Sequence, residues 1–260
     1  MQRIVPSGGK NVHDNPQTED FPQSTFVRGR TIDDETRDQS KRLDRQVISR
    51  QRVTEVGEVL TGKREVKAML DLVQQETERI ESRFLEPACG NGNFLAEILE
   101  RKLRVVEKRY ARSQLEYERY AILAVSSIYG IDILEDNVHQ CRRRLFGVFD
   151  ENYSRLFTNK TQHRCREAVW FILKQNITWG DALTLKTVGE EPEYIVFSEW
   201  SLVNGSTIKR RDFTFHGLFE HEGMKELPLF SDLGEDVFIP TPKKEYPPTH
   251  FMDIAHAQRR

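Results

Sequence analysis

Residues 84–95 read Phe84-Leu85-Glu86-Pro87-Ala88-Cys89-Gly90-Asn91-Gly92-Asn93-Phe94-Leu95. A short apolar run ends in an acid and a proline, a Gly-x-Gly turn follows, and an amphipathic helix begins. A strand, a turn and a helix in this order hold a nucleotide-like cofactor at the switch point of a doubly wound sheet. Gly90 and Gly92 allow positive φ and a close approach of the backbone to a ligand. Because Glu86 ends the strand and Phe94 replaces the third glycine of a pyrophosphate loop, the turn favours a cationic nucleoside over a dinucleotide.

This run resembles motif I of the S-adenosylmethionine-dependent DNA methyltransferases, specifically their amino-methylating (adenine-N6) branch, in which Glu-Pro-Ala-Cys-Gly-x-Gly-x-Phe-Leu is typical. The resemblance implies an α/β fold of the class I methyltransferase (Rossmann-like) type, with a doubly wound, mainly parallel sheet. It also implies S-adenosyl-L-methionine as the cofactor and DNA as a partner, reached directly or through a complex.

Two later phrases, which we expect to end the second and third strands, resemble further motifs of that family. Tyr-Gly-Ile-Asp-Ile follows an extra helix and places Asp132 where the family has the carboxylate that accepts both ribose hydroxyls. A carboxylate suits this task because both of its oxygens are acceptors. Asn-Ile-x-x-Gly-Asp-Ala-Leu resembles motif III, in which the aspartate, here Asp181, contacts the adenine amino group. Alternatively, Asp132 caps the helix expected over 135–149 and Asp181 caps a turn.

Residues 60–66 resemble motif X, which precedes motif I in one ordering of the family's motifs, although Gly62-Lys63 stands where its proline is usual. An ordinary packing helix is the alternative for this segment. Together the motifs imply a cofactor pocket formed by Thr61, Glu86, Pro87, Ala88, Cys89, Gly90, Gly92, Phe94, Asp132, Ile133, Asp181 and Ala182.

The resemblance breaks after residues 193–197, which have the pattern of a fourth strand. There the family has Asn-Pro-Pro-Tyr or Asp-Pro-Pro-Tyr, which binds the target amino group and stacks on the flipped base. Both prolines are missing here. We expect a loop over 198–201 in which Trp200 stacks on the base and Ser198 or Glu199 accepts a hydrogen bond from its amino group.

Composition divides the chain into three parts. Residues 1–52 are polar and form an arm that cannot bury enough apolar surface to fold, although Phe21, Phe26 and Val27 are candidates to dock on the domain or on a partner. Residues 53–240 form the Rossmann-like methyltransferase domain. Residues 241–260 form an extended, proline-containing tail with Pro247-Pro248.

The length after Trp200 favours a sheet with fewer strands than the parent fold. We expect one strand at Phe213–Phe215, in an edge hairpin that turns at Asn204-Gly205, and another at Asp236–Ile239. A reduced sheet leaves apolar surface for a partner chain or for the N-terminal arm to cover.

The composition also limits the protein's environment. The chain has 260 residues and a formal net charge of −2. It contains no apolar run near the roughly 18 residues of a membrane span, and its N-terminus lacks a secretory signal pattern. Cys89, Cys141 and Cys165 lack metal-ligand spacing, so we expect a reducing cytoplasm and no bound metal.

Local basic clusters occur at 101–119, 142–144 and 209–211. Such clusters neutralise phosphates, and solvated helix faces have the same composition.

Three functions fit these observations. The first is a DNA (adenine-N6) methyltransferase of a modification, restriction or defence system, with a partner protein that supplies target recognition. The second is a catalytically inactive relative that binds the cofactor and acts as a regulatory or binding subunit. The third is methyl transfer to another substrate, such as RNA or protein.

Overall fold

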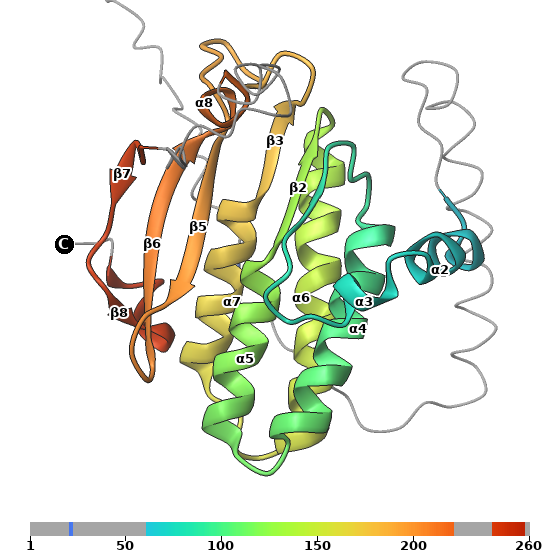
Figure 1. Cartoon of the computed structure of the whole chain (residues 1–260), viewed down its shortest axis with the longest axis vertical. Coiled ribbons are helices and arrows are strands. Elements are labelled where there is room, and N and C mark those ends of the chain that lie inside the picture. Colours follow the sequence, from blue (N-terminus) through green and yellow to red (C-terminus); the bar gives the residue numbers. More distant parts are fainter. Residues whose placement is uncertain (1–20, 23–60, 221–240, 258–260) are drawn as a thin grey trace, which may run out of the picture.

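The computed structural model describes residues 21–22, 61–220 and 241–257 (Figure 1). Its elements in chain order are α2 (Lys63–Asp71), α3 (Gln74–Thr77), β1 (Phe84–Glu86), α4 (Asn93–Tyr110), α5 (Gln114–Ser126), β2 (Ile128–Asp132), α6 (Glu135–Phe157), α7 (His163–Asn176), β3 (Ile177–Asp181), β4 (Lys186–Thr187), β5 (Val196–Leu202), β6 (Thr207–Thr214), α8 (Phe215–Glu220), β7 (Lys244–Glu245), β8 (Thr249–His250) and the 3₁₀ helix η2 (Phe251–Asp253). The protein therefore has a mixed α/β fold.

The first sheet contains the predicted parallel strands. β1, β2 and β3 lie side by side and run parallel, and β4 adds an antiparallel edge. All residues of the central strand β2 are buried, which explains why its sequence is almost continuously apolar.

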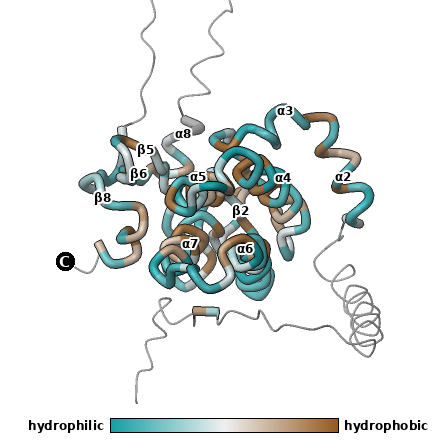
Figure 2. Tube along the Cα trace, turned by 90° about the horizontal axis from the view of Figure 1, so that it is seen from below, coloured by the Kyte–Doolittle hydropathy of each residue, from teal (hydrophilic) through white to brown (hydrophobic). Residues whose placement is uncertain are grey.

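Four long helices pack around this sheet and extend beyond it. α4 follows β1 and α6 follows β2, whereas α5 and α7 run almost directly into β2 and β3. Each helix contacts two others, in the order α4, α5, α7, α6 and back to α4, and Figure 2 shows the four grouped around β2. α6 is longer than the helix predicted over 135–149, because its added turns bury further side chains such as Tyr153.

The face of the first sheet opposite the Gly-x-Gly turn packs against a second, antiparallel sheet. In that sheet β5 and β6 pair over their full length, and β7 and β8 pair with β6. The contact between the two sheets is an apolar cluster of Tyr129, Ile131 and Phe197, joined by Ile195 just before β5 and by Phe215 at the start of α8. A doubly wound sheet has helices on both faces, and the described residues do not confirm this part of the expectation.

The predicted fourth strand is shifted along the chain. The expected strand over 193–197 begins only at Val196 and continues to Leu202. It is connected to β6 through Asn204-Gly205, where Gly205 has a φ of 52°, so the predicted hairpin and its turn are confirmed. The strand predicted at Asp236–Ile239 lies outside the described residues.

The segment 241–257 is not the extended tail that its composition indicated. It pairs with β6 as β7 and β8, and η2 then contacts α7. Phe251 is fully buried and Ile254 is nearly so. Strand pairing satisfies the backbone polar groups of this segment, and two apolar side chains attach it to the main core.

Most of the expected N-terminal arm, including Phe26 and Val27, lies outside the described residues. Phe21 is described, and its ring packs edge-on against Phe146 with 5.4 Å between ring centroids. Phe21 therefore docks on α6. Docking on the domain was one of the two predicted alternatives, the other being docking on a partner. Within the described residues, no helix combines the length and apolar composition that crossing a bilayer requires.

Candidate cofactor site

Three carboxylates stand at the carboxyl ends of adjacent parallel strands. Glu86, Asp132 and Asp181 are the last residues of β1, β2 and β3. Glu86 pairs with Gly130, two residues before Asp132, and Asp132 pairs with Trp179, two residues before Asp181. Because side chains alternate between the faces of a sheet and paired residues point the same way, all three carboxylates project from one face. The strand ends thus form a stepped acidic edge.

The glycine turn lies directly against this edge. The Cys89 N–H donates to the Ile131 carbonyl at 2.9 Å, and the Gly90 N–H donates to Asp132 Oδ2 at 2.7 Å. Gly90 and Gly92 have φ of 51° and 84°, in the left-handed region that favours glycine. A Cβ on Gly92 would lie 2.7 Å from Cys141 Sγ. The turn therefore requires glycine at position 92 for its backbone conformation and for its packing on α6.

Cys89 is buried within the turn. A hydrogen bond with the Cys141 thiol, together with burial, raises the pKa of Cys89. All three cysteines are free and buried. The flanking Pro87 and Ala88 are exposed, whereas Phe94 is half-buried in the first turn of α4 and packs on the main core.

Asp132 makes the capping contacts that the sequence left as an alternative. Its Oδ1 accepts hydrogen bonds from the Leu134 N–H at 2.9 Å and from Asn137 Nδ2 at 3.2 Å. With the bond from Gly90, three of its roughly four acceptor positions are used, and the residue is only 7% exposed. Asp132 therefore joins the glycine turn to the start of α6, and any ligand hydroxyl would have to share its oxygens with these donors.

Asp181 is more open to solvent. It accepts hydrogen bonds from the Leu183 N–H at 2.8 Å and from Thr184 Oγ1 at 3.0 Å, and the Leu183 bond, above all, lowers the pKa of Asp181. Beside it, Ile133 is 52% and Leu183 is 95% exposed. Ala182, in contrast, packs partly buried against the apolar contact between the two sheets. The edge near β3 thus combines an acceptor with exposed apolar side chains, which suits one face of a planar heterocycle.

Glu86 occupies a partly desolvated position at the end of β1. Burial raises the pKa of Glu86, and a backbone hydrogen bond from Ala88 partly opposes this change. A carboxylate in such a position gains from a cationic ligand more than a fully hydrated one does.

Residues 60–191 match the family model for the DNA-methyltransferase domain of MmeI. The chain belongs to this family. The matched region covers half of the sequence and runs from the start of α2 through β4, so it contains the glycine turn and the three acidic strand ends. No curated protein and no solved structure matches the chain.

Thr61, near the start of the matched region, also contacts the glycine turn. The Thr61 carbonyl accepts a hydrogen bond at 3.0 Å from Asn93 Nδ2, the first residue of α4. Asn93 and Asn91 in turn accept hydrogen bonds from Arg144 on α6. Sequence reasoning missed Arg144 because it stands in a basic cluster whose composition indicated phosphate binding or solvation.

The basic clusters at 142–144 and 209–211 are largely engaged within the protein. Arg142 donates to the Lys174 and Ile177 carbonyls at the end of α7. In the cluster 209–211, the three cations pair with acids: Lys209 with Glu245, Arg210 with Asp212, and Arg211 with Glu199. These pairs remove most of the positive charge that an unpaired cluster would offer to phosphates.

The expected catalytic loop over 198–201 does not exist, because these residues lie within β5. Ser198 is 1% exposed and its Oγ donates to Asp212 Oδ1 at 2.8 Å. Trp200 is 5% exposed and its Nε1 donates to Asn176 Oδ1 at 3.0 Å. Glu199 pairs with Arg83 and Arg211. The continuous β5–β6 pairing turns Ser198 and Trp200 into the protein, so neither is placed to contact a base.

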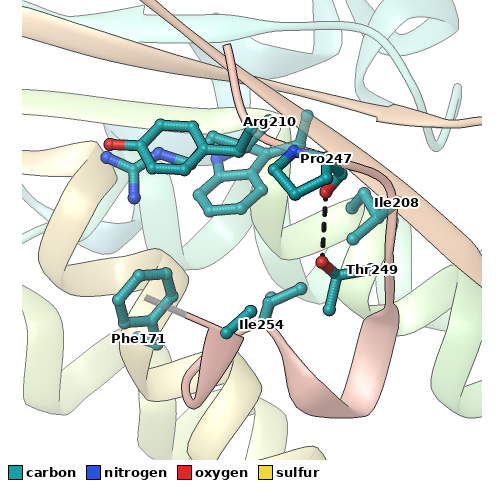
Figure 3. Close-up of a pocket in the computed structure, with 9 residues that line it drawn as sticks. Phe171, Ile208, Arg210, Pro247, Thr249 and Ile254 are labelled. Carbon is teal, nitrogen blue, oxygen red and sulfur yellow. Dashed lines mark hydrogen bonds between the residues drawn. The ribbon is translucent and has the colours of Figure 1, made fainter. Parts of the chain in front are cut away.

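Trp200 instead lines a small cavity away from the strand ends, shown in Figure 3. The cavity lies between the β5–β6 hairpin, α7 and the C-terminal segment, and its volume of about 40 Å³ is close to that of one water molecule. The Arg210 guanidinium lies over the rings of Trp200 and Tyr246 at 5.4 and 4.6 Å from their centroids. These contacts hold the hairpin and the C-terminal segment together. Across the described ranges, no group of three or more His, Cys, Asp or Glu residues is placed to hold a metal ion.

Proposed function

We propose that the acidic edge and the glycine turn bind S-adenosyl-L-methionine. The observation that carries this proposal is that Glu86, Asp132 and Asp181 end adjacent parallel strands and project from one face, beside a turn whose glycines have positive φ. The motif resemblance assigns the adenine to Asp181 and the ribose to Asp132, which leaves the sulfonium and amino-acid end for Glu86 and the turn. Partly desolvated Glu86 suits the positive charge of the sulfonium.

The proposed activity is DNA (adenine-N6) methylation within a modification or restriction system. Membership of the MmeI DNA-methyltransferase domain family and the adenine-type form of motif I support it. The proposal includes a cytoplasmic location and a partner protein that supplies target recognition. The cofactor supplies the methyl group when bound, and the described residues bind and orient it.

A second candidate is a subunit that binds the cofactor without transferring its methyl group. The burial of Ser198 and Trp200 within β5 favours it, because the residues expected beside the target base face the core. In addition, no Asn-Pro-Pro or Asp-Pro-Pro sequence occurs in the 260 residues. The cofactor pocket is common to both candidates, so it can be tested separately from catalysis.

Two measurements test the pair of proposals. Calorimetry with S-adenosylmethionine and with its demethylated product tests the pocket, and absence of heat with both ligands would refute it. Transfer of a radiolabelled methyl group to unmodified DNA tests the enzyme. Label in the DNA, lost in the variant Asp132→Ala, would favour the methyltransferase, whereas cofactor binding without any transfer would favour the non-catalytic subunit.

A further inference from the structure

Arg144 holds both sides of the glycine turn from a neighbouring helix. Its Nη1 donates to Asn91 Oδ1 at 3.2 Å and also to Asn93 Oδ1. The two asparagines flank Gly92, the left-handed residue that caps α4. One half-buried guanidinium on α6 therefore bridges the residues before and after the point where the backbone changes direction.

Asn93 extends this bridge to the start of α2. It receives a hydrogen bond from Arg144 and donates one to the Thr61 carbonyl. A guanidinium has only donors and a carbonyl has only acceptors, so these two partners define a single orientation for the Asn93 amide. Arg144, Asn93 and Thr61 thus connect α6, the turn and α2 in one chain of hydrogen bonds.

This chain lies at one end of the proposed ligand. Along the sheet edge the proposed order is adenine at β3, ribose at β2, and the amino-acid end at β1 and the turn. α2 packs on α4, and Figure 1 shows both helices on the far side of β2 from β3. Of the ligand's three parts, the amino-acid end is therefore the one that the hydrogen-bonded chain would border.

We propose that Arg144 is a positioning residue that acts through Asn91 and Asn93 to hold the glycine turn and Thr61, and thereby sets the affinity for the amino-acid end of the cofactor. The inference rests on the proposed binding of S-adenosylmethionine. It assigns a role to one arginine of the cluster 142–144, whose neighbour Arg142 donates to the Lys174 and Ile177 carbonyls.

The test compares two ligands on the full chain. S-adenosylhomocysteine carries the amino-acid end, whereas 5′-methylthioadenosine shares the adenosine and the sulfur but lacks it. We expect Arg144→Ala to raise the Kd of S-adenosylhomocysteine about tenfold or more, the usual scale for a lost charge-assisted hydrogen bond. The Kd of methylthioadenosine should change by less than about twofold. Arg142→Ala, on the same helix, and Arg143→Ala, an exposed neighbour, serve as controls and should leave the ratio of the two constants unchanged.

Each other outcome contradicts the inference. An equal loss for both ligands would mean that Arg144 supports the pocket as a whole, and no loss for either would mean that it does not act on the pocket. If the wild-type chain binds neither ligand, the proposed function fails, and amide hydrogen exchange still tests the bridge. Arg144→Ala should then speed exchange at Gly90 and Gly92 relative to Arg142→Ala, and unchanged protection would overturn the role of Arg144.

Discussion

Lys102 makes the stability of this protein depend on pH in an unusual direction. The side chain is fully buried on α4, and its ammonium donates to the carbonyls of Ile80, at 3.1 Å, and Ser82, and to Ser127 Oγ at 2.5 Å. Burial lowers the pKa of Lys102 from 10.5 to about 7, and the nearby acids Glu81 and Glu76 partly oppose this change.

The sign follows from proton binding in the two states. Between pH 7 and 10.5 the unfolded chain keeps the Lys102 proton and the folded chain loses it, so the free energy of unfolding rises with pH by about 1.4 kcal/mol per unit. Over the whole window the contribution reaches an upper limit of about 5 kcal/mol. It is fully present above pH 10.5 and is lost as the pH falls through 7.

Urea unfolding at pH 7, 8 and 9 measures this contribution. Lys102→Met keeps the apolar stem and removes the titration, so subtracting its curve cancels the contributions of tyrosines and cysteines that titrate in the same range. The wild-type protein should gain about 1.4 kcal/mol per pH unit relative to Lys102→Met. Lys108→Met, which removes an exposed lysine from the same helix, should keep the wild-type slope. Parallel curves for wild type and Lys102→Met would refute the reasoning and would mean that the three oxygens keep the ammonium charged in the fold.

Three further substitutions test the site and the fold. Asp132→Ala should weaken cofactor binding by more than about tenfold in calorimetry, because it removes a charged acceptor that also holds the Gly90 N–H; an unchanged Kd would remove the ribose assignment. Gly92→Ala should lower the free energy of unfolding by about 1–3 kcal/mol, through a strained φ and contact with Cys141, and stability equal to wild type would show that the turn adjusts. Phe251→Ala should cost about 3–5 kcal/mol in urea unfolding, and a loss near zero would mean that the C-terminal segment is not part of the core.

The sequence was most informative where local chemistry specifies local structure. The Gly-x-Gly turn, the acids at the ends of β1, β2 and β3, and the hairpin turn at Asn204-Gly205 were all predicted, because each depends on a few neighbouring residues and on a backbone conformation that glycine favours.

The pairing of strands far apart in the chain could not be predicted from the sequence in the same way. Ser198 and Trp200 had the composition of a loop after a strand, but pairing with β6 makes them the interior of β5. Likewise, the polar segment 241–257 gains its structure only because β6 offers an edge and α7 offers an apolar surface to Phe251. Contacts between residues far apart in the chain determine which strands pair. The sequence pattern of one segment does not contain this information.

The amino-acid order alone was therefore sufficient to place a glycine turn beside three acidic strand ends, since strand, turn and helix patterns are short-range. Arg144 shows what the amino-acid order alone could not predict. In the sequence it is one of three consecutive arginines, and only the packing of α6 against the turn directs Arg144 to Asn91 and Asn93 and Arg142 to α7. Helical geometry points neighbouring side chains in different directions, so their separate roles exist only once the helix is packed.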